Sequence, residues 1–220
     1  MSGRRVVVTG LGLISPTGNS VATGWRNTRD GISGISVVDS FDTTEFATKI
    51  GGVIKDFDVT DYMSKKEARK SDKFIHYGIA ACIEAFEDSG LEVVEANAHR
   101  FGVIMGSGIG GIHTIEQNYE KYRTGGARRI SPFFVPGSIV NMISGQVSIK
   151  YGMSGFNLAL VSACATSTHC IGLGARLIGS GDVDVVLAGG ADYATTPLGI
   201  GGFCAARALS TRNDDPAAAS

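Results

Sequence analysis

The sequence predicts an α/β protein in which helices cover a mostly parallel sheet in layers. Apolar runs of strand length, at residues 101–105, 156–161 and 183–188, alternate with segments of helical periodicity. Glycine accounts for 31 of the 220 residues, which suits the tight turns that such a fold requires. With 43% hydrophobic residues, a chain of this length can bury a sizeable core.

Composition excludes several classes of function. A formal net charge of −1 argues against general nucleic-acid binding. No apolar run reaches membrane-spanning length and no targeting leader is recognised, so we expect a soluble, cytoplasmic protein without membrane contact. No residues are spaced like the ligands of a metal ion. The cysteines, which lack Cys-x-x-Cys spacing and are expected to be reduced, are Cys82, Cys164, Cys170 and Cys204.

The first sixty residues predict short elements and no chemistry. Arg5 to Thr9 is β-branched and predicts a strand at the start of the chain. Residues 20–35 predict a short helix around Trp25, and the polar region from there to about residue 60 predicts loops with short strands.

A long helix is predicted from Tyr62 to Ser89, with Gly90 as its terminator, because apolar residues recur there at helical spacing. One face of this helix is basic, through Lys66, Arg69, Lys70 and Lys73. The pattern alone favours a solvated helix face, and a docking patch for an acidic partner is the alternative.

The turn Gly106–Gly111 satisfies the G-x-G-x-x-G pattern between the strand at 101–105 and a predicted helix. A nucleotide-binding module is therefore one alternative, which nucleotide titration would test. Dinucleotide binding also requires a second strand ending in Asp or Glu about twenty residues on, and residues 125–129 read Gly-Gly-Ala-Arg-Arg instead. Further along, Pro132 and Pro136 flank two phenylalanines, and a helix is predicted through Ile139 to Val147.

Cys164 is the strongest candidate for a nucleophile. It stands at the far end of the apolar run 156–161, where small residues open a helical segment, and this predicts a strand-to-helix turn. The first free N–H groups of such a helix lower the pKa of a thiol and offer donors to an oxyanion. Three glycines in residues 171–180 predict that this helix is buried against other backbone. On pattern alone, a buried structural cysteine is the alternative.

The run Ser-Ala-Cys-Ala-Thr-Ser-Thr-His-Cys, Ser162 to Cys170, resembles the active-site signature of the β-ketoacyl-acyl-carrier-protein synthases, most closely the bacterial synthase II group. The similarity covers the whole chain, through Arg5–Gly12, Gly106–Gly111, Ser131–Pro136 and Arg207–Thr211. It implies a thiolase-like fold, a layered α-β-α architecture built from two similar halves packed back to back. Residues 1–220 are then expected to be the N-terminal half only, ending within a polar surface loop.

The resemblance implies an acyltransferase of fatty-acid biosynthesis that needs no cofactor. Cys164 is implied to take an acyl group from acyl carrier protein, with its own N–H in the oxyanion hole, and to condense it with malonyl carrier protein to 3-oxoacyl carrier protein with loss of carbon dioxide. The residues implied to line the acyl pocket are Ile109, Phe134, Gly199 and Phe203. Those implied to dock the acidic carrier are Lys66, Arg69, Lys70 and, as an outlying contributor, Arg207. A homodimer is also implied, in which Phe156–Leu160 pairs with its own copy and Phe134 reaches the pocket across the interface.

None of the chain's four histidines is identified as the catalytic base. His169 is five residues from Cys164, about 140° around an α-helix, so the two cannot face one site from one helix. No accompanying motif makes His76 or His113 catalytic. The resembling synthases use two histidines of a second half, so we expect these residues alone not to condense acyl chains even if Cys164 is acylated. A non-catalytic partner subunit, like the chain-length factors of polyketide systems, is the last alternative, and Cys164 argues against it because those relatives lack the nucleophile.

Overall fold

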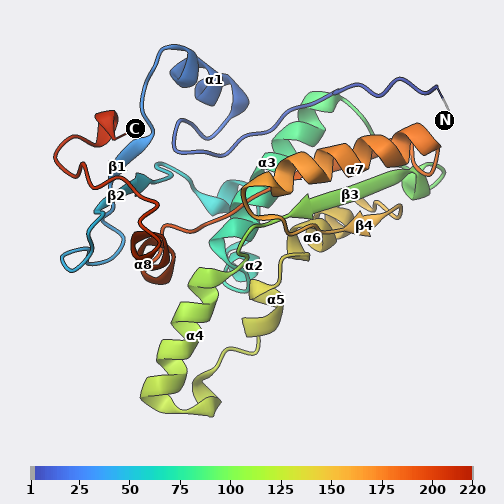
Figure 1. Ribbon diagram of the computed structural model, residues 1–220. Helices are drawn as coiled ribbons and strands as arrows, with labels where there is room; N and C mark the ends of the chain where they lie inside the picture. The colour runs from blue at the N-terminus through green and yellow to red at the C-terminus, as the bar shows by residue number, and fades with distance from the viewer. Residues whose placement is uncertain (1–2, 220) are drawn as a thin grey trace. The chain divides into compact units, whose positions relative to one another are not determined.

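The computed structural model describes residues 3–219, which form two compact units (Figure 1). One unit comprises residues 3–12 and 59–192, and the other comprises residues 13–58 and 193–219. The first unit holds the parallel sheet and Cys164.

A parallel sheet of strand order β4-β3-β5 forms the centre of the first unit. The middle strand β3 (Phe101–Gly106) is buried at all six residues. It pairs with β5 (Val185–Gly190) along its whole length and with β4 (Asn157–Leu158) over two residues. A strand that is covered on both faces is expected to be continuously apolar. The apolar runs at 101–105 and 183–188 correctly predicted β3 and most of β5.

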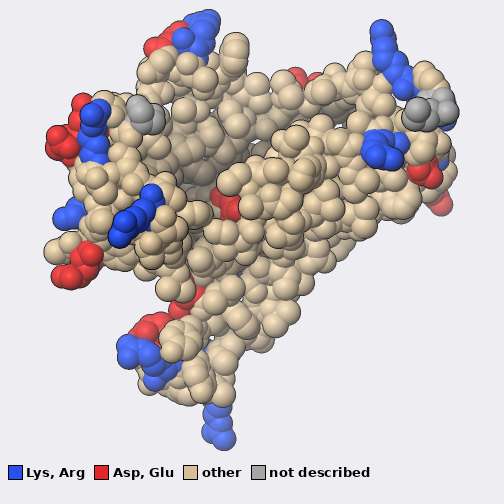
Figure 2. All heavy atoms as spheres, in the orientation of Figure 1, with Lys and Arg blue, Asp and Glu red and all other residues tan. Residues whose placement is uncertain are grey.

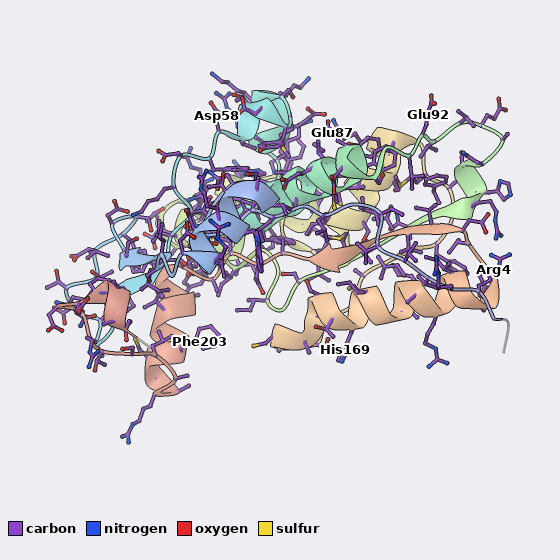
Figure 3. The ribbon with its side chains drawn as sticks, turned by 90° about the horizontal axis from the view of Figure 1, so that it is seen from above. Arg4, Asp58, Glu87, Glu92, His169 and Phe203 are labelled. Carbon is purple, nitrogen blue, oxygen red and sulfur yellow. The ribbon has the colours of Figure 1, made fainter. Side chains whose placement is uncertain are left out.

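Helices cover both faces of this sheet, and the predicted α-β-α layering is confirmed (Figures 1 and 3). On one face lies α7 (Thr166–Ser180), so close that a Cβ at Gly174 would lie 3.1 Å from Cγ1 of Val186. On the other face lie α3 (Lys73–Ser89) and α6 (Met142–Tyr151). These two helices meet where a Cβ at Gly78 would lie 2.5 Å from Cδ1 of Ile143.

The prediction that α7 is buried is confirmed for only one of its faces. Gly174 packs against β5, but a Cβ added at Gly172 or Gly179 would meet no atom within 4 Å outside the helix backbone. Ile171 is 53% exposed. One face of α7 is therefore covered by the sheet, and its opposite face is largely uncovered.

The strand predicted at Arg5–Thr9 is also absent. Residues 3–12 run as an irregular segment along α3, where Leu11 N donates to Asp88 Oδ2 at 2.9 Å. Val7 and Val8 are 59% and 73% exposed. A β-branched segment becomes a strand only when another edge satisfies its backbone, and no described strand pairs with this one.

The long helix predicted from Tyr62 to Ser89 is broken into η1 (Val59–Asp61), α2 (Lys65–Ala68) and α3. The breaks occur because the sequence holds two strong helix starts. Ser64 forms a capping box with Glu67 at the start of α2. Buried Asp72 caps α3 by accepting from Phe74 N at 3.3 Å, and its other carboxylate oxygen accepts from Thr114 N at 2.6 Å.

These breaks have two consequences. The basic residues Lys66, Arg69, Lys70 and Lys73 do not share one face of a continuous helix, as predicted, but span α2, the break and the first residue of α3. The predicted terminator is confirmed, since Gly90 ends α3 in the left-handed conformation at φ +63°.

The remaining elements of this unit are α4 (Ile112–Gly125), which has 14 residues, and several short helices. The short helices are η2 (Ala98–Arg100), η3 (Ala127–Arg129), α5 (Phe134–Ser138) and η4 (Ala163–Ala165). The helix predicted through Ile139 to Val147 begins only at Met142, because Ile139 is extended at ψ 142°.

The second unit agrees with the short elements predicted for it. Its helix α1 (Val21–Arg29) contains Trp25 and starts at Ser20, whose side chain accepts from Thr23 N. An antiparallel pair follows, β1 (Ile35–Val37) with β2 (Ile50–Gly52). The unit ends with α8 (Pro197–Ala205) and η5 (Pro216–Ala218). Among the described residues of both units, none of the helices has the length and apolarity to cross a membrane.

Candidate active site

Cys164 lies in the short helix η4, directly before α7, and is exposed. The strand before it is shorter than predicted, since β4 ends at Leu158. An irregular stretch leads from there to Ser162. Cys164 thus follows the carboxyl end of one parallel strand and precedes a helix N-terminus, the place where open α/β sheets bind ligands.

The turn before Cys164 is strained. Ala163 has φ +52°, a left-handed conformation that costs a residue with a Cβ about 1 kcal/mol. Thr166, 4% exposed, holds this turn through its hydroxyl, which accepts from Ser162 N at 2.9 Å and donates to Ala163 O at 2.8 Å. The side chain of Ser162 is bonded at 2.6 Å to Nδ1 of His169, which Figure 3 shows on α7. Two side chains of α7 therefore fix the backbone that presents the thiol.

A free donor accompanies the thiol. The first N–H groups of a helical segment have no acceptor within the helix, and within residues 3–219 the Cys164 N–H has none elsewhere. The thiol and an N–H able to stabilise an oxyanion thus belong to one residue.

The ends of the neighbouring strands approach this turn closely. A Cβ at Gly106, the last residue of β3, would collide with Leu160 O and with Thr166 Cγ2. A Cβ at Gly190, the last residue of β5, would lie 3.0 Å from Ser167 Oγ. Glycine at both strand ends lets the start of α7 pack directly on the sheet.

Three N–H groups of the glycine turn after β3 are already bonded within the chain and are not offered to a phosphate. Gly108 N and Ile109 N donate to the Asp192 carboxylate at 2.9 and 3.2 Å, and Gly110 N donates to Ser107 Oγ at 2.9 Å. The position at which a dinucleotide fold needs its second strand is the short helix η3. Both observations argue against the nucleotide-binding alternative.

The other cysteines differ from Cys164 in burial. Burial raises the pKa of Cys82 to about 12 and also raises the pKa of Cys170. Both are buried, and Cys204 is half-buried. Since the thiolate is the nucleophilic form, exposure favours Cys164 over the two buried thiols.

The residues expected to line an acyl pocket fall in both units. Ile109, 42% exposed, lies in the glycine turn, and half-buried Phe134 begins α5. These two segments touch through Gly111 N, which donates to Ser138 O at 3.0 Å. Gly199 and Phe203 lie on α8 of the second unit. The pocket as a whole therefore stays a prediction.

The residues expected to dock a carrier protein are also divided. Lys66 and Arg69 are exposed on and after α2, and the ammonium of Lys70 lies 5.0 Å from the ring centroid of Phe133. This segment is joined to α5, because Asp72 N donates to Gly137 O at 3.1 Å. Arg207, exposed at φ +55°, belongs to the second unit.

Sequence reasoning missed two features of the site and one surface away from it. It gave no role to Asp192, although an acidic residue just after a strand's carboxyl end is a signal. It gave none to Thr166 either, because nothing in the sequence shows which backbone groups a hydroxyl will reach. It also missed a second basic surface at the far end of α4 (Figure 2), formed by exposed Lys121, Arg123, Arg128 and Arg129.

Comparison with known proteins decides the family. The sequence profile "Beta-ketoacyl synthase, N-terminal domain" matches residues 3–220. The chain belongs to the β-ketoacyl synthase family. The resemblance seen in the sequence is thereby confirmed.

Relatives and solved structures of the β-ketoacyl synthases agree with this. A 3-oxoacyl-[acyl-carrier-protein] synthase 2 from Vibrio cholerae is 56% identical over 220 residues, 100% of this chain and 53% of that protein. The ishigamide ketosynthase/chain length factor superposes with a TM-score of 0.83 at 27% identity, over 92% of this chain and 50% of that one. A type II polyketide ketosynthase in complex with its acyl-carrier protein, AntDE:AntF, has a TM-score of 0.76 at 26% identity, over 93% and 55%. The chain therefore spans about half the length of the synthases it matches, and the thiolase-like fold is confirmed.

The site predicts selective chemistry at Cys164. At pH 8, limiting iodoacetamide should modify Cys164 before Cys82 and Cys170, because raised pKa values keep the two buried thiols protonated. Peptide mass mapping after short exposure measures this order, and Cys164→Ser should lose the first adduct. A first adduct on Cys82 or Cys170 would contradict the assignment.

Proposed function

We propose that residues 1–220 form the N-terminal half of a 3-oxoacyl-[acyl-carrier-protein] synthase of the type 2 class, a cytoplasmic enzyme of fatty-acid elongation. The names of the most similar relatives support this, and so does the share of their length that the chain covers. The observation that carries the proposal is the exposed Cys164, presented from a left-handed turn at a helix N-terminus beside two strand ends.

In the first step, the thiolate sulfur of Cys164 attacks the carbonyl carbon of an acyl carrier-protein thioester. The carbonyl oxygen becomes an oxyanion, which the Cys164 N–H is positioned to stabilise. The tetrahedral intermediate collapses, the carrier's sulfur leaves and takes a proton, and the acyl group remains on Cys164. Covalent capture divides one difficult reaction into two easier ones.

In the second step, malonyl carrier protein loses carbon dioxide, and the resulting carbanion attacks the acyl carbon on Cys164. The bond to sulfur breaks, which returns the thiolate and releases 3-oxoacyl carrier protein. Negative charge develops on the malonyl thioester oxygen and needs donors. His169 is bonded to Ser162, and His76 is bonded to Ala68 O and Ser71 Oγ at 3.0 and 3.1 Å. The proposal therefore assigns those donors to the second half of the enzyme.

The two steps can be tested separately. Residues 1–220 and the complete enzyme are each incubated with acyl carrier protein, and intact mass reports acylation before malonyl carrier protein is added. Both should acquire one acyl group that Cys164→Ala abolishes, and only the complete enzyme should extend the chain. Extension by residues 1–220 at the complete enzyme's rate would show that a base lies within them, and an acylated Cys164→Ala variant would overturn the role of the cysteine.

A second candidate, the non-catalytic partner subunit, is disfavoured by one observation. The solved neighbour described as a ketosynthase/chain length factor combines both kinds of subunit in its name. An exposed cysteine in a turn held by two side chains suits the ketosynthase role, since a subunit without chemistry has no need of it.

Lys66, Arg69 and Lys70 are proposed to dock the acyl carrier protein. A carrier-protein complex is described for one structural neighbour. In this chain, the three residues lie between two capped helix starts, the capping box at Ser64 and the cap at Asp72. Preorganised positive charge of this kind raises the rate of association with an acidic partner.

Charge reversal tests this docking surface. The variant Lys66→Glu/Arg69→Glu/Lys70→Glu should bind carrier protein at least about tenfold more weakly at low salt, mainly through a slower association rate, and added salt should reduce the difference. Surface plasmon resonance measures both rates. The matched control Arg26→Glu/Arg29→Glu/Lys55→Glu makes the same charge change at exposed positions and should bind nearly normally. An equal loss of carrier affinity in both variants would show that only the net charge of the protein matters, and not these three positions.

Homodimerisation is proposed from the edge of the sheet. β4 is an edge strand, and Phe156, Leu158 and Val161 on or beside it are 42%, 40% and 59% exposed. An exposed apolar edge is a template for pairing with another chain. We expect the complete enzyme to sediment as a dimer at micromolar concentration, and Leu158→Lys to shift it toward monomer while Val94→Lys, at another exposed apolar position, does not. A monomeric wild type would contradict the proposal.

A further inference from the structure

We propose that Thr166 is the positioning residue of the nucleophile, and that its hydroxyl, not its bulk, sets the rate at which Cys164 is acylated. The inference rests on the proposed acyl transfer to Cys164. Two hydrogen bonds join Thr166 Oγ1 to Ser162 N and Ala163 O, at 2.9 and 2.8 Å. Both bonds lie on the two residues that immediately precede Cys164.

The hydroxyl opposes a conformational preference. Ala163 adopts φ +52°, and an alanine free to relax would leave that conformation for a right-handed or extended one. Relaxation would rotate the peptide that follows and move the Cys164 thiol and N–H together. Thr166 prevents this by holding the peptide groups on both sides of the Ser162–Ala163 bond, and its own position at the start of α7 is fixed by burial.

The methyl group of Thr166 has a separate role. It packs against β3, since a Cβ at Gly106 would lie 2.5 Å from Thr166 Cγ2. Thr166→Val keeps the volume and this contact but removes the hydroxyl, whereas Thr166→Ser keeps the hydroxyl and removes the methyl. The two variants therefore separate positioning from packing.

The chemical consequence concerns the first step of the reaction. Acyl transfer requires the sulfur to reach the acyl carbon while the Cys164 N–H meets the carbonyl oxygen, and displacement of such groups by about 1 Å can cost on the order of 100-fold in rate. Alkylation by a small reagent such as iodoacetamide requires only access to the sulfur. Loss of the hydroxyl should thus slow acylation far more than alkylation.

The experiment measures, by intact mass in the complete enzyme, the rates of acylation by acyl carrier protein and of alkylation by iodoacetamide. For Thr166→Val we expect acylation roughly 10- to 100-fold slower than wild type and alkylation within about threefold. Thr166→Ser should acylate within a few fold of wild type even if its melting temperature falls. The matched control Thr168→Val makes the same chemical change at an exposed position two residues along α7 and should leave both rates unchanged.

A double variant tests the conformational step directly. Glycine adopts positive φ without the cost that alanine bears, so Ala163→Gly added to Thr166→Val should recover part of the lost acylation rate. No recovery would show that Thr166 does not act through the Ala163 turn and would overturn the inference. Wild-type acylation in Thr166→Val would also overturn it, as would equal losses in Thr166→Ser. A wild-type enzyme that is alkylated but never acylated would instead refute the proposed function.

Discussion

Parallel pairing of β3 with β4 and β5 brings three strand ends to one edge of the sheet, and the candidate site depends on that arrangement. Burial of every residue in β3 fixes the pairing. The last residues of β3 and β5 are glycines, which allows the first residues of α7 to pack directly against both strand ends. Cys164 lies just before α7, next to these strand ends. The position of the Cys164 thiol therefore depends on the close packing of the start of α7 against the ends of β3 and β5.

The extent to which sequence could predict the structure follows from whether each signal is local. The runs that became β3 and β5, the terminator Gly90 and the turn at Cys164 are encoded within a few consecutive residues. The strand expected at Arg5–Thr9 could not be predicted from local sequence, because a strand forms only where a partner strand satisfies its backbone hydrogen bonds. The same holds for Asp192 and Thr166, whose partners were not recognisable before the fold was known.

The broken helix shows a different limit. Apolar residues recur at helical spacing from Phe74 to Phe86, and this pattern predicted one helix from Tyr62 to Ser89. Ser64 and Asp72 nevertheless each begin a separate helix, because their side chains accept hydrogen bonds from the free N–H groups at a helix start. The separate helix start at Ser64 places Lys66 and Arg69 on and directly after a short capped helix. The carboxylate of Asp72, three residues after Arg69, accepts a hydrogen bond from α4. A buried acidic residue thus organises a basic surface.

The uncovered glycines of α7 have a consequence for tolerance to substitution. Gly172 is exposed and Gly179 is half-buried, and at both positions the space that a Cβ would fill is open, so a neighbouring element could approach the backbone more closely than a side chain would permit. In the chain by itself an alanine at either position meets nothing, and it even favours the helix by about 1 kcal/mol. Once a second surface rests on that face, the same methyl group becomes an obstacle to close contact. Substitutions at these two positions can therefore be harmless to folding and still harmful to assembly.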